Sequence, residues 1–330
     1  MTRAERRPTI VDVARAAGVS KSLVSSALRG ESGVSAASRD AIAAAVESLG
    51  YRSNGWAQRL VSGRSSLVGV LLTDLRNAYQ TDIVNGIEDA ATAAGFEVIL
   101  SHGRRDRSVL RARLGALIDL GVDAVIAVTG HLAEAELAAA GERVPLVVVG
   151  RPESVPRAVG WVRNDDEAGA RLAAEHLRER GHERIAFASG SGRPATLARR
   201  DTYRTLVAEP REFDVRDGGT AQLLDAVTAE GVSAVFAAND RIAAQIVAEA
   251  ADRGIRVPDD LAVVGYDNTE LATLVRPGLT SVDQPRGEMG AEAMAQALAQ
   301  LQGGAPRAFV ATPRLVERAS SGRARSISRT

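Results

Sequence analysis

From residue 66 onward, the sequence alternates between short apolar runs and longer, Ala-rich amphipathic stretches. The apolar runs are 67–72, 97–100, 124–128, 146–149, 159–162, 184–188, 234–237 and 261–264. The stretches between them include 83–94, 109–120, 169–179, 241–253 and 287–301. An apolar run without polar alternation is typical of a strand buried on both faces, as in a parallel sheet covered by helices. The pattern predicts an α/β fold. Because about 250 residues is large for one open sheet, we expect two sheets.

Polar side chains follow several of these runs, at the points where the chain leaves the carboxyl ends of the expected strands. They are Asp74, Asn77, Arg199, Asn239, Asp267 and Gln284. Ligands of open α/β sheets bind beyond the carboxyl ends of the strands. A carboxylate, an amide and a guanidinium that converge there form a fixed set of donors and acceptors for vicinal hydroxyl groups. The sequence therefore predicts a cleft for a hydroxylated small molecule.

Several of these residues also have a purely structural interpretation. Asn239 and Asp240 can turn the chain and cap a helix, with Asp240 favoured as the cap. Asp267 can be a solvated loop carboxylate, and Arg199 can be a surface arginine in a crowded charged segment. The sequence pattern alone leaves these alternatives open.

Formal charge is distributed unevenly along the chain. The 41 basic and 41 acidic residues cancel over the 330 residues. Residues 1–64, however, hold ten of the basic residues and only five of the acidic ones. A basic segment joined to a neutral or acidic body is typical of a nucleic-acid-binding module attached to a second domain.

The chain contains no cysteine, which excludes disulfides, cysteine-ligated zinc and thiol catalysis. The first residues lack the apolar segment of a signal peptide. The longest apolar runs are about five residues, far short of the ~18 that a membrane span needs. We therefore expect a cytoplasmic, nucleoid-associated protein with no membrane partner, no cofactor and no metal.

The first fifty residues predict three short helices. Thr9, Ser20 and Ser35 each precede a segment with helical apolar spacing, as N-cap residues do. The small residues Ala14 and Gly18 allow the first two helices to cross closely, as a helix-turn-helix requires. Short polar or cationic side chains face away from the core on the second helix and suit a major groove: Lys21, Ser22, Ser25, Ser26 and Arg29. An ordinary solvated helical bundle is the alternative for this segment taken alone.

Ordered motifs in and after this segment resemble the lac repressor (LacI/GalR) family of transcription factors. They are Ala17-Gly-Val-Ser20, Val24-Ser25, Val34-Ser35, Leu49-Gly-Tyr51, Asn54 and Ala57-Gln-Arg-Leu60. The resemblance continues through nearly the whole chain. It implies a dimeric, effector-responsive DNA-binding regulator, most often a repressor, whose two-fold symmetry matches a roughly palindromic operator.

The resemblance also implies a domain organisation. The helical DNA-binding domain would span residues 1–53, a hinge helix and linker 54–65, an effector-binding and dimerisation core 66–318, and a tail 319–330. The core would have the fold of periplasmic binding proteins, with two Rossmann-like subdomains. We expect one at about 66–162 together with 286–318, and the other at about 163–285.

Specific DNA contacts follow from the same resemblance. Leu60 of each subunit would wedge between base pairs in the minor groove and bend the duplex. Lys21 and Ser22 are the expected base-reading residues. Other residues of the set are expected to contact the DNA phosphates or the minor groove and so to position the protein on the duplex. The expected DNA-binding set is Thr9, Ser20, Lys21, Ser22, Ser25, Ser26, Arg29, Ser35, Tyr51, Asn54, Ala57 and Leu60. Leu23, Ser26 and Arg29 depart from the family pattern, so no operator sequence is implied.

In the core, the resemblance implies an effector site for a sugar, polyol or nucleoside. Its expected residues are Asp74, Asn77, Tyr79, Arg199, Asn239, Asp267 and Gln284. Asp165 and Asp166 match a family turn, and we interpret them mainly as helix caps. Between Tyr203 and Phe213 the chain is shorter than usual, which predicts a trimmed helix and loop. Arg104, Arg105 and Arg107 can accept an anionic effector, although a solvated basic face is the favoured interpretation.

Two other functional classes fit parts of the sequence. Asp165, Asp166 and Asp267 can be the paired carboxylates of a cleft enzyme acting on carbohydrate, but such an enzyme does not need residues 1–64. A periplasmic-type sugar-binding protein shares the expected cleft, but it carries an export signal and no basic helical head. The sequence therefore favours a regulator over an enzyme or a transport protein.

Overall fold

The computed structural model describes residues 8–28, 33–50, 65–216 and 218–324. The chain divides into two compact units, residues 1–65 and 66–330, each of which is described by itself. Five of the expected DNA-contacting residues lie outside the described ranges: Arg29, Tyr51, Asn54, Ala57 and Leu60. No helix in the described ranges is both long enough and apolar enough to cross a membrane.

The N-terminal unit contains the three helices that the sequence predicts: α1 (Ile10–Ala16), α2 (Lys21–Leu28) and α3 (Ala36–Ser48). Ser20 and Ser35 are caps as expected, whereas at Thr9 the backbone N–H and the hydroxyl both donate to Asp12. The backbone N–H of Thr9 donates to Asp12 at 2.8 Å, and Ser20 and Ser35 each accept a backbone N–H at 3.2 Å. One small core joins the three helices, built on Val13, Ala14, Val24, Ile42 and Ala45.

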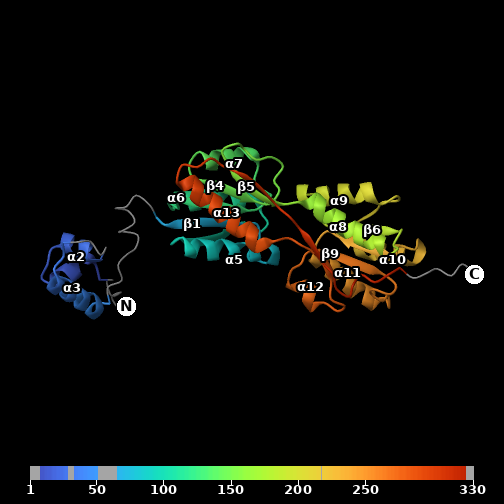
Figure 1. The fold of residues 1–330 in the computed structure, drawn as a ribbon, viewed down its shortest axis with the longest axis horizontal. Coiled ribbons are helices and arrows are strands. Elements are labelled where there is room, and N and C mark those ends of the chain that lie inside the picture. The colour runs from blue at the N-terminus through green and yellow to red at the C-terminus, as the bar shows by residue number, and fades with distance from the viewer. Residues whose placement is uncertain (1–7, 29–32, 51–64, 217, 325–330) are drawn as a thin grey trace, which may run out of the picture. The chain divides into compact units, whose positions relative to one another are not determined.

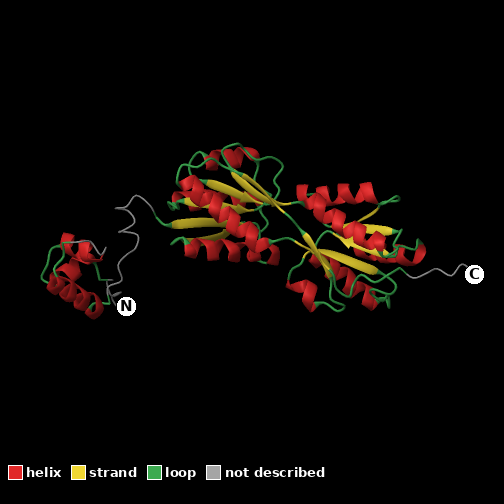
Figure 2. Cartoon of the chain, viewed as in Figure 1, coloured by secondary structure: helices red, strands yellow, loops and turns green. Residues whose placement is uncertain are grey.

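The larger unit begins with a six-stranded parallel sheet (Figures 1 and 2). Its strand order is β11-β5-β4-β3-β1-β2. The strands are β1 (Leu67–Leu72), β2 (Glu97–His102), β3 (Ala124–Val128), β4 (Leu146–Val149), β5 (Gly160–Asn164) and β11 (Ala308–Ala311). Two apolar clusters cover it, one with α5 (Ala78–Ala93) and α13 (Arg286–Leu301), the other with α6 (Arg107–Asp119) and α7 (Glu134–Gly141).

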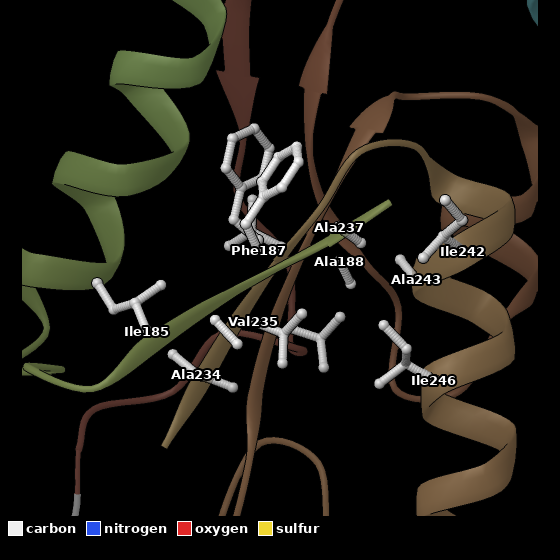
Figure 3. Packing of buried hydrophobic residues seen from close by; sticks show 14 of the residues in the cluster. Ile185, Phe187, Ala188, Ala234, Val235, Ala237, Ile242, Ala243 and Ile246 are labelled. Atoms are coloured by element: carbon white, nitrogen blue, oxygen red, sulfur yellow. The ribbon is translucent and has the colours of Figure 1, made fainter. Parts of the chain in front are cut away.

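A second six-stranded sheet has the order β12-β10-β9-β8-β6-β7 and is parallel except for β12. Its strands are β6 (Ile185–Ser189), β7 (Arg211–Asp214), β8 (Ala234–Ala237), β9 (Ala262–Asp267), β10 (Thr280–Asp283) and β12 (Arg314–Val316). The helices are α8 (Asp166–Glu179), α9 (Pro194–Leu206), α10 (Gly219–Ala229), α11 (Asp240–Asp252) and α12 (Glu270–Leu274). Figure 3 shows α11 packing Ile242, Ala243 and Ile246 toward β6 and β8. The two sheets confirm the predicted fold class.

The chain passes between the two sheets three times: after β5, after β10, and between β11 and β12. The last passage corrects one expected boundary. The family resemblance places residues 286–318 in the first subdomain, but Arg314–Val316 pairs antiparallel with β10 of the second sheet. Ser320 and Ser321, in the expected tail, are also buried there. The reason is backbone pairing: β12 hydrogen-bonds along β10, and the N–H of Val263 donates to the Ser320 carbonyl at 2.7 Å.

Helices α5 and α13 cross at glycines. A Cβ placed on Gly86 would overlap the carbonyl oxygen of Gly287, and one on Gly290 would overlap that of Ile83. The two backbones are therefore in direct contact on one face of the first sheet. This contact matters for function because α13 begins directly after β10, where the chain returns from the second subdomain.

Gly86→Ala is expected to lower the free energy of unfolding by about 1–3 kcal/mol, because the added methyl group forces the two helices apart. Gly115→Ala is the matched control. Gly115 lies within α6 with open space around its missing Cβ, so this variant gains about 0.5–1 kcal/mol of helix propensity. Urea unfolding of both variants gives the comparison. Equal changes in both would show that the crossing is looser than the structure describes.

Candidate functional site

A cavity of about 550 Å³ lies between the two subdomains of the larger unit. Loops from both sheets line it, at the carboxyl ends of β1, β3, β4 and β5 and of β6, β8, β9 and β10. Its volume is in the range of small-molecule sites. All seven expected effector residues are among the residues that line it: Asp74, Asn77, Tyr79, Arg199, Asn239, Asp267 and Gln284. The structure brings them together, and their contact with a ligand is taken up below as a proposal.

Arg199 of α9 is one of the little-exposed polar residues that line the cavity, called the floor below: Asn164, Asp166, Arg199 and Asp267. Its Nε donates to Asp166 Oδ1 at 2.8 Å, and a terminal nitrogen donates to the Ala238 carbonyl at 2.7 Å. The guanidinium lies 3.5 Å from the centroid of the Tyr266 ring, in a cation–π arrangement. With its side chain only 10% exposed, Arg199 is a buried, fixed donor. The surface-arginine alternative is therefore wrong.

Asp267 ends β9 beside this arginine, 3.9 Å from its nearest terminal nitrogen. The Gln284 amide donates to Asp267 Oδ1 at 2.6 Å. Burial raises the pKa of Asp267, Arg199 opposes this shift and the charge of Asp240 adds to it, so that the pKa is about 7. The backbone is left-handed here, with φ of 96° at Asp267. Backbone strain of this kind is concentrated at binding sites, where the surrounding fold enforces it.

The pair Asn239 and Asp240 corrects a sequence interpretation. Asn239, not Asp240, caps α11, because its side chain accepts the Ile242 N–H at 3.0 Å. Asp240 is 1% exposed. It accepts the Thr269 N–H at 2.6 Å and the Ser281 hydroxyl at 2.6 Å. Asp240 thus ties together the loops that hold Asp267, while Asn239 both caps the helix and lines the cavity.

The sequence interpretation makes caps of both Asp165 and Asp166, but only Asp165 has that role. The Asp165 carboxylate accepts the Ala168 N–H at 2.9 Å and caps α8. Asp166 points the other way, is buried, lines the cavity and binds Arg199. A signal for it was available, since it follows the carboxyl end of β5 as the other floor residues follow their strands.

Sequence reasoning also missed Asn164, the last residue of β5. It is 3% exposed, and its Nδ2 donates to the Tyr266 hydroxyl at 2.8 Å. Its Oδ1 has no hydrogen-bond partner among the described residues, although it is buried and the residue lines the cavity. A buried acceptor without a partner is costly unless a ligand or water satisfies it. Asn164 therefore supplies an open acceptor for a ligand hydroxyl.

The wall from the first subdomain is built at the ends of β1 and β2. Asp74 is 5% exposed and is bound by Arg105 at 2.5 Å. Asn77 caps α5 by accepting the Tyr79 N–H at 3.2 Å. Burial and the charge of Asp267 raise the pKa of Tyr79, so its phenol is a neutral donor. Gln80, missed by sequence reasoning, donates to the Val128 carbonyl at 3.1 Å and joins β1 to β3.

The expected base-reading residues lie at the start of α2 in the N-terminal unit. Lys21 and Ser22 are exposed, whereas Ser25 and Ser26 are half-buried. Ser20 and Ser35 are exposed helix caps, and the Thr9 side chain is engaged with Asp12. A cationic and a hydroxyl side chain are thus presented at a helix N-terminus, as recognition helices present them.

Two family descriptions match this chain: bacterial regulatory proteins, lacI family, over residues 9–54, and periplasmic binding protein-like domain, over residues 174–321. Catabolite control protein A of Priestia megaterium is 34% identical over 304 residues, covering 87% of this chain and 90% of that protein. The transcriptional regulator CelR of Thermobifida fusca is 36% identical, also covering 87% and 90%.

Solved structures show the same likeness. The lac repressor dimer bound to operator and the anti-inducer ONPF is similar with a TM-score of 0.83 at 27% identity, covering 96% of this chain and 100% of that one. A CelR–cellobiose complex is similar with a TM-score of 0.68 at 30% identity, covering 95% and 100%. These relatives are regulators rather than enzymes.

Proposed function

Because the chain belongs to the lacI family of bacterial regulatory proteins, we propose that it is a dimeric repressor whose affinity for a palindromic operator is controlled by a hydroxylated small molecule in the cleft. The proposal that the protein binds an effector is carried by one observation: four polar side chains converge on one cavity between the subdomains, namely Arg199, Asp166, Asp267 and Asn164. These groups offer both fixed donors and fixed acceptors to vicinal hydroxyls.

Regulation follows from where the cavity lies. Each wall comes from a different subdomain, so a ligand that contacts both walls stabilises one arrangement of the subdomains over another. The chain enters the first subdomain at β1, directly after residues 54–65, which we propose form the hinge. An effector that favours one arrangement changes operator affinity by some factor, and the operator must change effector affinity by the same factor.

The DNA-binding half of the proposal rests on the N-terminal unit. Lys21 and Ser22 are proposed to read base edges in the major groove, and Leu60 of each subunit is proposed to enter a base step in the minor groove. Support comes from the lac repressor relative, whose structure is that of a dimer bound to operator.

The test begins with an operator selected from random duplexes by the purified full-length protein. Operator binding is then titrated by fluorescence anisotropy with and without members of a panel of sugars, polyols and nucleosides. The proposal predicts that one compound changes operator affinity at least about fivefold, the lower end of ordinary allosteric coupling. If no sequence is enriched over random duplex, the regulator assignment fails.

Leu60→Ser is expected to weaken operator binding at least about tenfold and to leave binding to random duplex within about twofold. A polar side chain cannot replace the apolar wedge, whereas phosphate contacts are retained. Leu120→Ser is the control, since Leu120 is an exposed leucine in the larger unit, and it should change neither affinity. Equal weakening on both duplexes by Leu60→Ser would refute the wedge.

A further inference from the structure

The cavity carries an excess of positive charge over the described residues that line it. Seven arginines and three aspartates do so: Arg105, Arg151, Arg163, Arg193, Arg199, Arg216 and Arg241, against Asp74, Asp166 and Asp267. Ion pairs account for only some of these arginines: Arg105 with Asp74, Arg151 with Glu167, Arg199 with Asp166, and Arg216 with Asp214. A site for an uncharged sugar alone does not need this excess.

Arg193 and Arg241 form no hydrogen bond or ion pair through their side chains with any described residue. Arg163 lies 4.9 Å from the centroid of the Trp161 ring and forms no hydrogen bond or ion pair with a described residue through its side chain, although its charge acts on Glu167. Guanidinium groups that face a cavity without an acidic partner are ready to bind an anion through two parallel hydrogen bonds.

Arg105 and Arg193 hold like charges near each other from opposite subdomains. Arg105 follows β2 in the first subdomain, and Arg193 directly precedes α9 in the second. The pKa of Arg193 is lowered, first by burial and then by the positive charge of Arg105. Arg193 and Arg107 act in the same way on His131, whose pKa falls to about 4, chiefly through burial. On this side of the cavity Asp74 pairs with Arg105, whereas Arg193 has no acidic partner among the described residues.

The N-terminus of α9 lies on the same side. No side chain caps it within the described part of the chain, and Arg193 is its N-cap residue. Ser191, Ala195 and Thr196, around this helix start, all line the cavity. The free N–H groups of a thirteen-residue helix and its positive dipole end favour a bound anion.

The position of Arg105 is enforced by its loop. Arg104 and Arg105 both have left-handed backbones, with φ of 54° and 65°. The Arg105 N–H donates to the Thr73 carbonyl at 3.0 Å, and its side chain, 49% exposed, is bound by Asp74. Of the three rim arginines that the sequence suggested, Arg105 is the one among the cavity-lining residues. Two consecutive strained residues are expected where a side chain must be held toward a ligand.

From these observations we infer that the effector is a phosphate ester of a sugar or polyol. Its phosphate would lie between Arg105, Arg193 and the N-terminus of α9, and its hydroxyls would lie on the floor formed by Arg199, Asp267 and Asn164. A dianion between the two arginines removes the repulsion between the subdomains and so favours their approach. This inference rests on the proposed function and specifies the ligand class of the same site.

The experiment compares phosphate esters with their parent compounds on the full-length protein by isothermal titration calorimetry. The probes are glucose and glucose 6-phosphate, fructose and fructose 6-phosphate, ribose and ribose 5-phosphate, and inorganic phosphate alone. At least one ester should bind tenfold or more tightly than its parent, and inorganic phosphate at millimolar concentration should raise the Tm relative to chloride of equal ionic strength. An absence of both effects overturns the inference.

Two variants locate the binding. Arg193→Gln should weaken the ester at least tenfold and the parent less than twofold, because Arg193 supports no other described contact through its side chain. Arg157→Gln is the matched control: Arg157 is an exposed loop arginine outside the cavity lining, and it should change neither affinity. Equal effects of the two variants would overturn the placement of the phosphate.

This failure is distinguishable from failure of the proposed function. If a neutral parent sugar binds as tightly as its phosphate ester and changes operator affinity, the inference of a phosphate ester is wrong, but the proposed regulatory function is supported. If the esters bind in the cleft with the expected preference but no cleft ligand changes operator affinity, the inference stands as ligand chemistry and the regulatory proposal fails.

Discussion

Arg199→Leu is expected to lower the free energy of unfolding by about 3–5 kcal/mol, the cost of leaving a buried carboxylate without its partner. Asp166 is 3% exposed at its side chain and lies 2.8 Å from the Arg199 Nε. The substitution also removes the donor to the Ala238 carbonyl. Arg151, 3.7 Å from the other Asp166 oxygen, remains and limits the loss.

Arg200→Leu is the matched control, one residue further along α9. Arg200 is bound by Asp201 at 2.9 Å, with side chains 29% and 59% exposed. Exposed pairs of this kind contribute about 0–1 kcal/mol, so the control should remain near the wild-type stability. Urea unfolding of the effector-free protein measures both variants.

The double variant Arg199→Leu with Asp166→Asn completes the test. Removing the stranded charge should recover part of the lost stability, since the remaining amide is cheaper to bury than a carboxylate. If Arg199→Leu and Arg200→Leu cost the same, or if Asp166→Asn restores nothing, the ion pair does not have the role that its burial indicates.

Arg199 illustrates what the sequence could predict about the site. A polar residue after a buried apolar run is placed at the cleft by topology, and that rule found six lining residues, whereas Tyr79 came from the family resemblance. The same rule applies to Asp166, yet its neighbour Asp165 satisfied the expectation of a cap. Two adjacent aspartates divide the two roles, because one step along the chain turns the side chain from the helix start toward Arg199.

The limits of the fold prediction have a similar cause. The apolar runs in the sequence have the same bounds as the observed strands β1, β3, β4 and β8, because these strands are buried throughout. The edge strands β7, β11 and β12 were missed: only part of each is covered, and β7 alternates between half-buried and exposed residues. Helix α9 was also missed, since arginines and threonines make up much of its length.

Asp267→Asn is expected to weaken effector binding about 100-fold. A carboxylate accepts hydrogen bonds from two ligand hydroxyls, and losing charge-assisted bonds of this kind costs about 1.5–3 kcal/mol each. Operator binding without effector should stay within about twofold, because Asp267 lies in the cleft of the larger unit. Anisotropy titrations with the effector identified by the screen measure both. Loss of operator binding as well would show that the variant disturbs more than the ligand site.

The same substitution is expected to stabilise the effector-free protein at alkaline pH. Asp267 has a pKa of about 7 in the folded chain and about 4 when unfolded. Its contribution to stability is therefore fully present below about pH 4 and is lost as the pH rises through about 7. Asparagine has no proton to lose. At about pH 8, the free energy of unfolding of Asp267→Asn should exceed that of the wild type by about 1–3 kcal/mol. This difference should shrink toward about pH 4.

Asp165→Asn is the control for this pH dependence, since asparagine caps a helix as well as aspartate does and Asp165 is outside the cavity lining. Effector affinity follows the opposite trend to stability. Because the ligand hydroxyls need the ionised carboxylate, wild-type affinity should rise more steeply from about pH 6 to about pH 8 than the affinity of Asp267→Asn, which keeps only the rise due to ionisation of a ligand phosphate with a pKa of about 6. Equal rises in the two proteins would mean that Asp267 is already ionised in the empty cleft, and that Arg199 outweighs burial in setting its charge.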